Sequence, residues 1–177
     1  GKTIPLLREV ARNLDLIKYF PNELKDLSIE NFESAYSKLH DKNDLKNLNL
    51  INKKINDYFS TLELPDEPNL YDTINLSLRK KDVIATFNWD PFLMQSRIRL
   101  TKLGITQNFP RLIFLHGNVA VGYCEKDKIA GLNNKHCSKC GKIFKPSQLL
   151  YPVLNKNYQE NPDKNPEKIM ILLYIFP

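Results

Sequence analysis

Residues 82–90 read DVIATFNWD, and this stretch decides the predicted fold class. Its run 83–87 is short, apolar and β-branched, as expected of a strand that is buried on both faces. Two further apolar runs, 112–115 and 169–176, have the same character. A helical pattern lies between the first two runs, and buried strands that alternate with helices are typical of an α/β protein with a parallel sheet.

Roughly the first eighty residues are predicted to be mainly helical. Apolar residues recur there at every third or fourth position in four segments: 6–17, 29–39, 45–59 and 70–78. Ser28 is expected to cap the second of these helices, because its hydroxyl can accept a hydrogen bond from a first-turn amide. After the first strand, Asp90 is expected to cap another helix that has Pro91 at its first position.

The composition is that of a folded chain with a basic surface. The chain has 177 residues, of which 42% are hydrophobic, and a formal net charge of +6. The excess is mostly lysine mixed with acids, as in 41–57, without the interleaved arginines and aromatic residues of a nucleic-acid platform. We therefore expect a solvated lysine-rich surface rather than a nucleic-acid interface. No apolar run approaches the ~20 residues of a membrane span, and the first residues do not read as a signal peptide, so we expect a cytoplasmic protein.

Polar residues directly follow the first two predicted strands. Asn88 and Asp90 follow the first strand, and His116 follows the second. Open α/β sheets bind ligands beyond the carboxyl ends of their strands, so these three side chains lie where a site is expected. Each also has a purely structural explanation: Asp90 can be only a helix cap, Asn88 only a turn residue, and a lone histidine in such a loop is more often structural than catalytic.

Taken together, these motifs resemble those of sirtuin-like proteins. Residues 82–90 resemble the strand and Asn-x-Asp signature of that family, and Leu115-His116-Gly117 resembles its Leu-His-Gly motif. Three cysteines follow in the family's order: Cys124, Cys137 and Cys140. The similarity in residue type, order and spacing covers residues 82 to 158, and the divergent bacterial members of the family are the most similar.

The resemblance implies a Rossmann-like NAD-binding domain over residues 1–177. Within it, residues 15–70 would form a helical insertion and residues 120–148 a small, zinc-ribbon-like cysteine module. The family's first strand and glycine-rich phosphate loop would precede Gly1, so we expect a domain that is truncated at its N-terminus. The opening segment resembles the one that follows this loop, which makes Arg8 a predicted cofactor-binding residue.

The resemblance also implies roles for the strand-end residues in cleaving the nicotinamide–ribose bond of NAD. Asp90 would hold the carboxamide, Asn88 would position a water or a ribose hydroxyl, and His116 would act as the base. Thr86 and Gly117 would help to line the cofactor site.

Three functions are compatible with these motifs. The favoured one is hydrolysis of NAD to nicotinamide and ADP-ribose, which the similarity to divergent bacterial members connects with antiphage defence. A NAD-dependent protein deacetylase is the second, although residues 149–158 lack the Phe-Gly-Glu of classical sirtuins. A non-catalytic module that binds NAD or a partner is the third. A homo-oligomer and further domains are left open.

The stretch CSKCG at 137–141 has the form of a zinc knuckle, in which two thiolates lie across a tight turn. A structural zinc site needs four ligands, and Cys124 is the predicted third. His136 and Asp127 are the alternatives for the fourth. Reduced cysteines in a degenerate module are the competing hypothesis, and a redox-active Cys-x-x-Cys pair is another.

Overall fold

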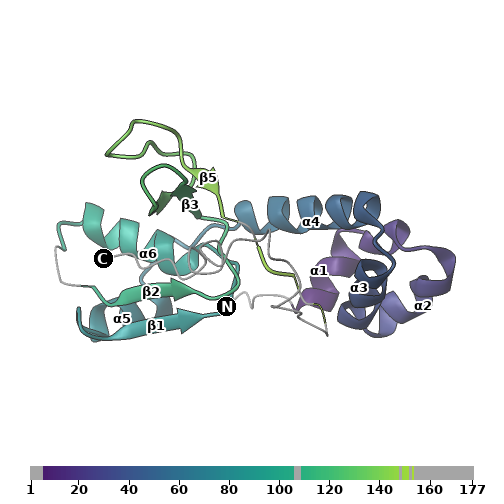
Figure 1. Cartoon of the computed structure of the whole chain (residues 1–177). Helices are drawn as coiled ribbons and strands as arrows, with labels where there is room; N and C mark the ends of the chain where they lie inside the picture. The colour runs from purple at the N-terminus through teal and green to yellow at the C-terminus, as the bar shows by residue number, and fades with distance from the viewer. Residues whose placement is uncertain (1–5, 106–108, 148, 152, 154–177) are drawn as a thin grey trace. The chain divides into compact units, whose positions relative to one another are not determined.

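The computed structural model of the chain describes residues 6–105, 109–147, 149–151 and 153. They form two compact units. The first comprises the described residues up to Tyr58 together with Tyr151 and Val153, and the second comprises those from Phe59 to Leu150. Figure 1 shows the helices of the first unit and the strands of the second. No helix in this part of the chain is long and apolar enough to cross a membrane. The predicted strand 169–176 lies outside the described residues.

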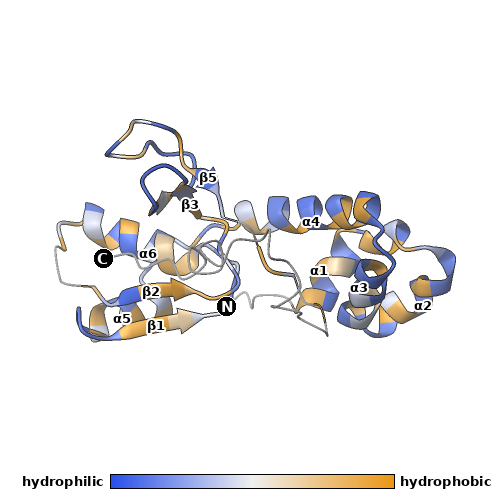
Figure 2. Ribbon diagram, viewed as in Figure 1, coloured by the Kyte–Doolittle hydropathy of each residue, from blue (hydrophilic) through white to orange (hydrophobic). Residues whose placement is uncertain are grey.

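The first unit is built from helices. They are α1 (Leu7–Asn13), the short 3-10 helix η1 (Leu16–Tyr19), α2 (Asn22–Glu30), α3 (Phe32–Asp41) and α4 (Leu45–Ser60), whose end enters the second unit. Apolar and polar residues alternate along α4, as the orange and blue segments of Figure 2 show. Leu48, Ile51 and Ile55 of α4 are buried, which confirms the helical spacing predicted for 45–59.

Two helix boundaries differ from the prediction. The pattern over 6–17 does not form one helix, because Asp15 adopts a left-handed conformation with φ of 51° between α1 and η1. Ser28 is not a helix cap, since it lies within α2 and its hydroxyl donates to a backbone carbonyl three residues earlier. Asn31 caps α3 instead, and its Oδ1 accepts a hydrogen bond from the amide of Ser34 at 3.0 Å.

A pair of parallel strands and two helices form the centre of the second unit. These elements are α5 (Leu70–Ser77), β1 (Val83–Thr86), α6 (Phe92–Lys102) and β2 (Arg111–Phe114). The strands pair from Val83 opposite Arg111 to Thr86 opposite Phe114. The α/β class and the parallel pairing are therefore confirmed, whereas a larger, Rossmann-like sheet stays a prediction.

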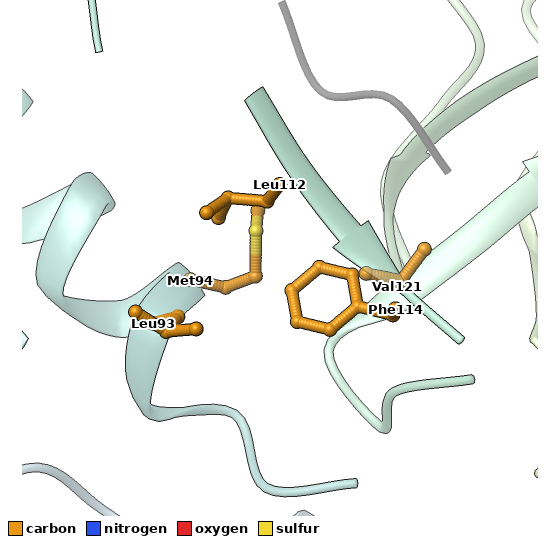
Figure 3. Close-up of a cluster of buried hydrophobic side chains, with 5 residues drawn as sticks. All are labelled: Leu93, Met94, Leu112, Phe114 and Val121. Carbon is orange, nitrogen blue, oxygen red and sulfur yellow. The ribbon is translucent and has the colours of Figure 1, made fainter. Parts of the chain in front are cut away.

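One buried apolar cluster joins α6 to β2. Leu93 and Met94 of α6 pack with Leu112 and Phe114 of β2 and with Val121, the first residue of the next strand (Figure 3). The cluster takes alternate residues of β2, because successive side chains of a strand point to opposite faces. This packing fixes the position of α6 against the parallel pair.

The first strand is less buried than its sequence predicts. Val83 of β1 is 42% exposed and Phe87, just beyond the strand, is 61% exposed, whereas Ile84 packs against the buried cluster. The prediction of a run that is buried on both faces is therefore wrong for 83–87. A continuous apolar run does not show which face of the strand a helix will cover, because that depends on how distant segments of the chain pack against it.

Buried polar side chains hold α5 against α6. The hydroxyl of Ser96 donates to Oδ1 of Asp72 at 2.8 Å, and Nδ2 of Asn75 donates to Oγ of Ser96 at 3.0 Å. Asp72 also forms an ion pair with Arg99. Hydrogen-bonded groups of this kind specify one arrangement of two helices, so α6 is held in one place against α5.

A small antiparallel sheet follows β2. It consists of β3 (Val121–Cys124), β4 (Ile129–Leu132) and β5 (Lys145–Pro146), in the order β4-β3-β5. Gly131 of β4 lies against the ring of Phe144, where a Cβ atom at Gly131 would be 2.1 Å from Cε2 of the ring. Only glycine permits this close approach, which seats Phe144 over the sheet.

We expect Gly131→Ala to destabilise the protein by about 1–3 kcal/mol, the usual range for overpacking, because the added methyl group collides with Phe144. The midpoint of urea unfolding measures the change. Gly104→Ala is the comparison, because its Cβ would meet open space, so any loss of stability there comes from its φ of +80° and not from a collision. Equal midpoints for the wild type and Gly131→Ala would contradict this packing.

Candidate functional site

The parallel pairing brings the ends of β1 and β2 together. Thr86 lies opposite Phe114, and the next amide, that of Leu115, donates to the carbonyl of Thr86 at 2.8 Å. Asn88 and His116 each follow the last paired residues by two positions. The predicted catalytic residues of the two strands therefore start from the same edge of the sheet.

Two of the predicted residues are linked by a hydrogen bond at the end of β1. The backbone amide of Asn88 donates to Oγ1 of Thr86 at 3.1 Å. Asn88 is exposed, whereas Asp90 is only 5% exposed. Burial raises the pKa of Asp90, and hydrogen bonds from the amides of Phe92 and Asp90 and from Asn88 oppose that rise.

Asp90 also serves the first turn of α6. Its Oδ1 accepts a hydrogen bond from the amide of Phe92 at 3.2 Å. The helix begins at Phe92 with Pro91 in the capping position, one residue later than predicted. The carboxylate thus makes a capping contact without itself being the cap residue.

Asn118 organises the loops around these residues, a role that the sequence did not reveal. Its side chain is 1% exposed. Nδ2 donates to the carbonyl of Asp90 at 2.5 Å, and Oδ1 accepts from the amide of Ala120 at 2.9 Å. The hydroxyl of Ser147 donates to the carbonyl of Asn118 at 2.7 Å. One residue thus ties the loop after β1 to the loop after β2 and to the segment after β5.

The remaining predicted residues occupy different environments. His116 is half-buried, and its carbonyl accepts from the amide of Leu150 at 2.9 Å. Gly117 is buried and has φ of 79°, a left-handed conformation that favours glycine, where the chain turns from β2 towards Asn118. Arg8 is exposed on α1, in the first unit, and its predicted role in cofactor binding stays a prediction.

The second candidate site lies in the cysteine module. One ligand atom from each of four residues lies within 4.8 Å of the others, and the four are Cys124, Asp127, Cys137 and Cys140. The Sγ atoms of Cys124 and Cys140 are 3.4 Å apart, and Oδ2 of Asp127 lies 3.0 Å from Sγ of Cys137. A Zn–S bond of about 2.3 Å separates the sulfur atoms of a tetrahedral site by about 3.8 Å. The four residues are therefore close enough to hold a metal ion.

These ligands come from two turns of the same construction. The amide of Lys128 donates to the carbonyl of Cys124 in the first turn, and the amide of Gly141 donates to that of Cys137 in the second, both at 2.9 Å. Lys128 and Gly141 are both left-handed, with φ of 55° and 71°. Asp127 therefore occupies the place in the first turn that a second cysteine occupies in the other.

Between the two alternatives for the fourth ligand, the structure brings Asp127 into the cluster and not His136. His136 is exposed and forms a β-bridge with Ile143, which closes the hairpin around the second turn. A signal for Asp127 was present, since it follows Cys124 by three positions, the spacing of the Cys-x-x-Cys pair. The spacing identifies Asp127 as a ligand only together with the matching backbone of the two turns.

The cluster places one carboxylate next to three thiol groups, and each affects the ionisation of the others. The carboxylate of Asp127 raises the pKa of the Cys140 thiol to about 12, and hydrogen bonds from Cys140 and Cys137 lower the pKa of Asp127 to about 2. One negative charge thus opposes the ionisation of the thiol beside it. A divalent cation would reverse this effect, because it favours the thiolate form of each ligand.

Comparison of the chain with protein-family models, with curated proteins and with solved structures finds no match. The two sites are therefore interpreted from their own geometry. The residues Asn88, Asp90 and His116, which we call the strand-end site, offer an amide, a buried carboxylate and an imidazole. These groups suit hydrogen bonding and proton transfer. The cysteine module offers sulfur and oxygen ligands, which suit a metal ion.

We expect Asn118→Ala to lower the free energy of unfolding by about 1–3 kcal/mol, because it removes a buried carboxamide that joins Asp90 to Ala120. Urea unfolding gives the value. Asn88→Ala is the control, since Asn88 is exposed and its loss should change stability by no more than about 0.5 kcal/mol. An Asn118→Ala protein as stable as the wild type would contradict the organising role.

Proposed function

We propose that this chain carries the NAD-cleaving face of a sirtuin-like domain and hydrolyses NAD to nicotinamide and ADP-ribose. The observation that supports this most directly is the common origin of Asn88, Asp90 and His116 at the carboxyl edge of the β1–β2 pair. Sheets of this class bind ligands beyond that edge. The resemblance of residues 82–90 and of the Leu-His-Gly segment to sirtuin-like motifs supports the choice of NAD.

The reaction requires a base and a residue that orients the attacking water or a ribose hydroxyl. Nicotinamide leaves as a neutral molecule with the electron pair of the glycosidic bond, while the ribose carbon gains oxocarbenium character. A water oxygen then bonds to that carbon and loses a proton, for which His116 is the proposed acceptor, since imidazoles exchange protons near neutral pH. Asn88 has an exposed amide that would orient this water or a ribose hydroxyl.

Asp90 has two tasks in this proposal. Its buried carboxylate accepts a hydrogen bond from the first turn of α6. The same carboxylate would accept a hydrogen bond from the carboxamide of nicotinamide. Such a bond is stronger in a buried environment than in water, because the effective dielectric constant is lower there.

The strand-end site suits one end of NAD. In the described part of the chain, α6 begins at Pro91-Phe92, without the glycine-rich turn that cradles a pyrophosphate at a helix start. The proposal therefore assigns the nicotinamide and its ribose, rather than the phosphates, to this face of the second unit.

The cysteine module is proposed to hold a structural Zn²⁺ ion. Four protein ligands would close the coordination sphere, as in structural zinc sites, and three thiolates favour zinc over magnesium or calcium. The module leads directly into Ser147, which hydrogen-bonds Asn118. An ordered module would thereby support the loops of the strand-end site without taking part in the reaction.

The purified protein should release nicotinamide from NAD without any acetylated peptide. We expect His116→Ala and Asn88→Ala each to reduce the rate by about 100-fold or more, the range for loss of a general base or its partner. Chromatography of nicotinamide and ADP-ribose measures the rate. His136→Ala is the control, because this exposed histidine lies outside both sites, and it should keep wild-type activity.

Three outcomes would change the proposal. Full activity in a folded Asn88→Ala protein would remove that residue from the site. Release of nicotinamide only with an acetyl-lysine peptide would identify a deacetylase. NAD binding by calorimetry without any release would identify a binding module.

Protein prepared with zinc should contain one equivalent of the metal per chain. Asp127→Ala should weaken Zn²⁺ binding by about tenfold or more, whereas Asp127→Cys should retain it, because it completes four thiolates. Competition with a chromophoric chelator measures the affinity, and His136→Ala is again the control. Weakened binding in His136→Ala but not in Asp127→Ala would show that the fourth ligand has been misassigned, and metal content far below one equivalent would overturn the zinc site.

A further inference from the structure

Phe87 is an aromatic side chain at the strand-end site that has no role in the function proposed so far. It lies between Thr86 and Asn88, and it is 61% exposed, so it contributes little to the buried cluster. The centroid of its ring lies 4.7 Å from that of the His116 imidazole, and the two ring planes are inclined by 60°. This separation lies within the range of a favourable edge-to-face contact.

The backbone is held on both sides of this contact. Next to Phe87, the amide of Asn88 donates to Oγ1 of Thr86 at 3.1 Å. The carbonyl of His116 accepts from the amide of Leu150 at 2.9 Å. The two rings therefore extend from fixed main-chain positions.

We propose that Phe87 is a positioning residue, whose ring holds the His116 imidazole in one orientation at the strand-end site. The role of His116 as the base in this inference rests on the proposed function. A base acts only within hydrogen-bonding reach of the proton that it accepts, so the orientation of its ring affects the rate. An imidazole packed against a ring spends more of its time within reach.

The consequence is specific to one kinetic constant. Loss of the ring leaves the groups proposed to bind NAD in place, so KM should change little. The fraction of time in which the imidazole is oriented should fall, and kcat should fall with it. An edge-to-face contact of ordinary strength corresponds to a decrease in kcat of about two- to tenfold.

The test compares Phe87→Leu, which keeps apolar volume but removes the ring, with Phe87→Tyr, which keeps the ring. In the protein without NAD, proton–carbon NMR spectra report the imidazole signals of His116, which are identified by their loss in His116→Ala. We expect these signals to move in Phe87→Leu, because the ring current is lost, and to stay near their wild-type positions in Phe87→Tyr. We expect kcat to fall about two- to tenfold in Phe87→Leu and to be restored in Phe87→Tyr.

Val83→Ala is the matched control, since Val83 is an exposed apolar residue of β1 remote from the ring pair along the strand. It should change neither the imidazole signals nor kcat. Equal unfolding midpoints for the wild type and Phe87→Leu would show that the effect is not a loss of stability.

The outcomes separate this inference from the proposed function. Unchanged imidazole signals in Phe87→Leu overturn the positioning role whether or not the protein cleaves NAD. An increased KM with unchanged kcat also overturns it, because Phe87 would then contact substrate. A wild-type protein that never releases nicotinamide refutes the proposed function, while the NMR comparison still decides whether Phe87 orients His116.

Discussion

The buried carboxamide of Asn118 is the constraint on which the arrangement of the second unit depends. A buried carboxamide needs hydrogen-bond partners for both its donor and its acceptor. A buried donor or acceptor without a partner destabilises the fold by more than a typical hydrogen bond stabilises it. The side chain of Asn118 donates to the carbonyl of Asp90 and accepts from the amide of Ala120, and its backbone carbonyl accepts from the hydroxyl of Ser147. The loops that present the strand-end residues therefore cannot move apart without exposing buried polar groups.

The cysteine module is too small to be held by apolar burial alone. Its buried cluster consists of Cys124, Cys137 and Phe144. Modules of this size commonly gain their stability from a metal ion, whose binding free energy becomes folding free energy. Two matching turns place four ligand atoms close enough to hold such an ion. Because the strand β5 leads into Ser147, the organisation of the module continues into the loops of the strand-end site.

Some features could be predicted from the sequence because they depend on neighbours along the chain. The strands at 83–86 and 111–114 and the long helix α4 followed from apolar spacing. The choice between Ser28 and Asn31 as a cap did not, because both are good capping residues and the end of α2 decides between them. The exposure of Phe87 was also beyond prediction, since it depends on which face the helices leave uncovered.

The sequence by itself determined the α/β class, the polar residues that follow two strands, and the tight cysteine turn, because each is encoded within a few consecutive residues. Only the tertiary structure decided that Asp127 rather than His136 joins the cysteines, and that Phe87 meets His116. These contacts arise when segments far apart in the chain pair in one register. That register follows from the packing of the whole unit, which no local pattern specifies.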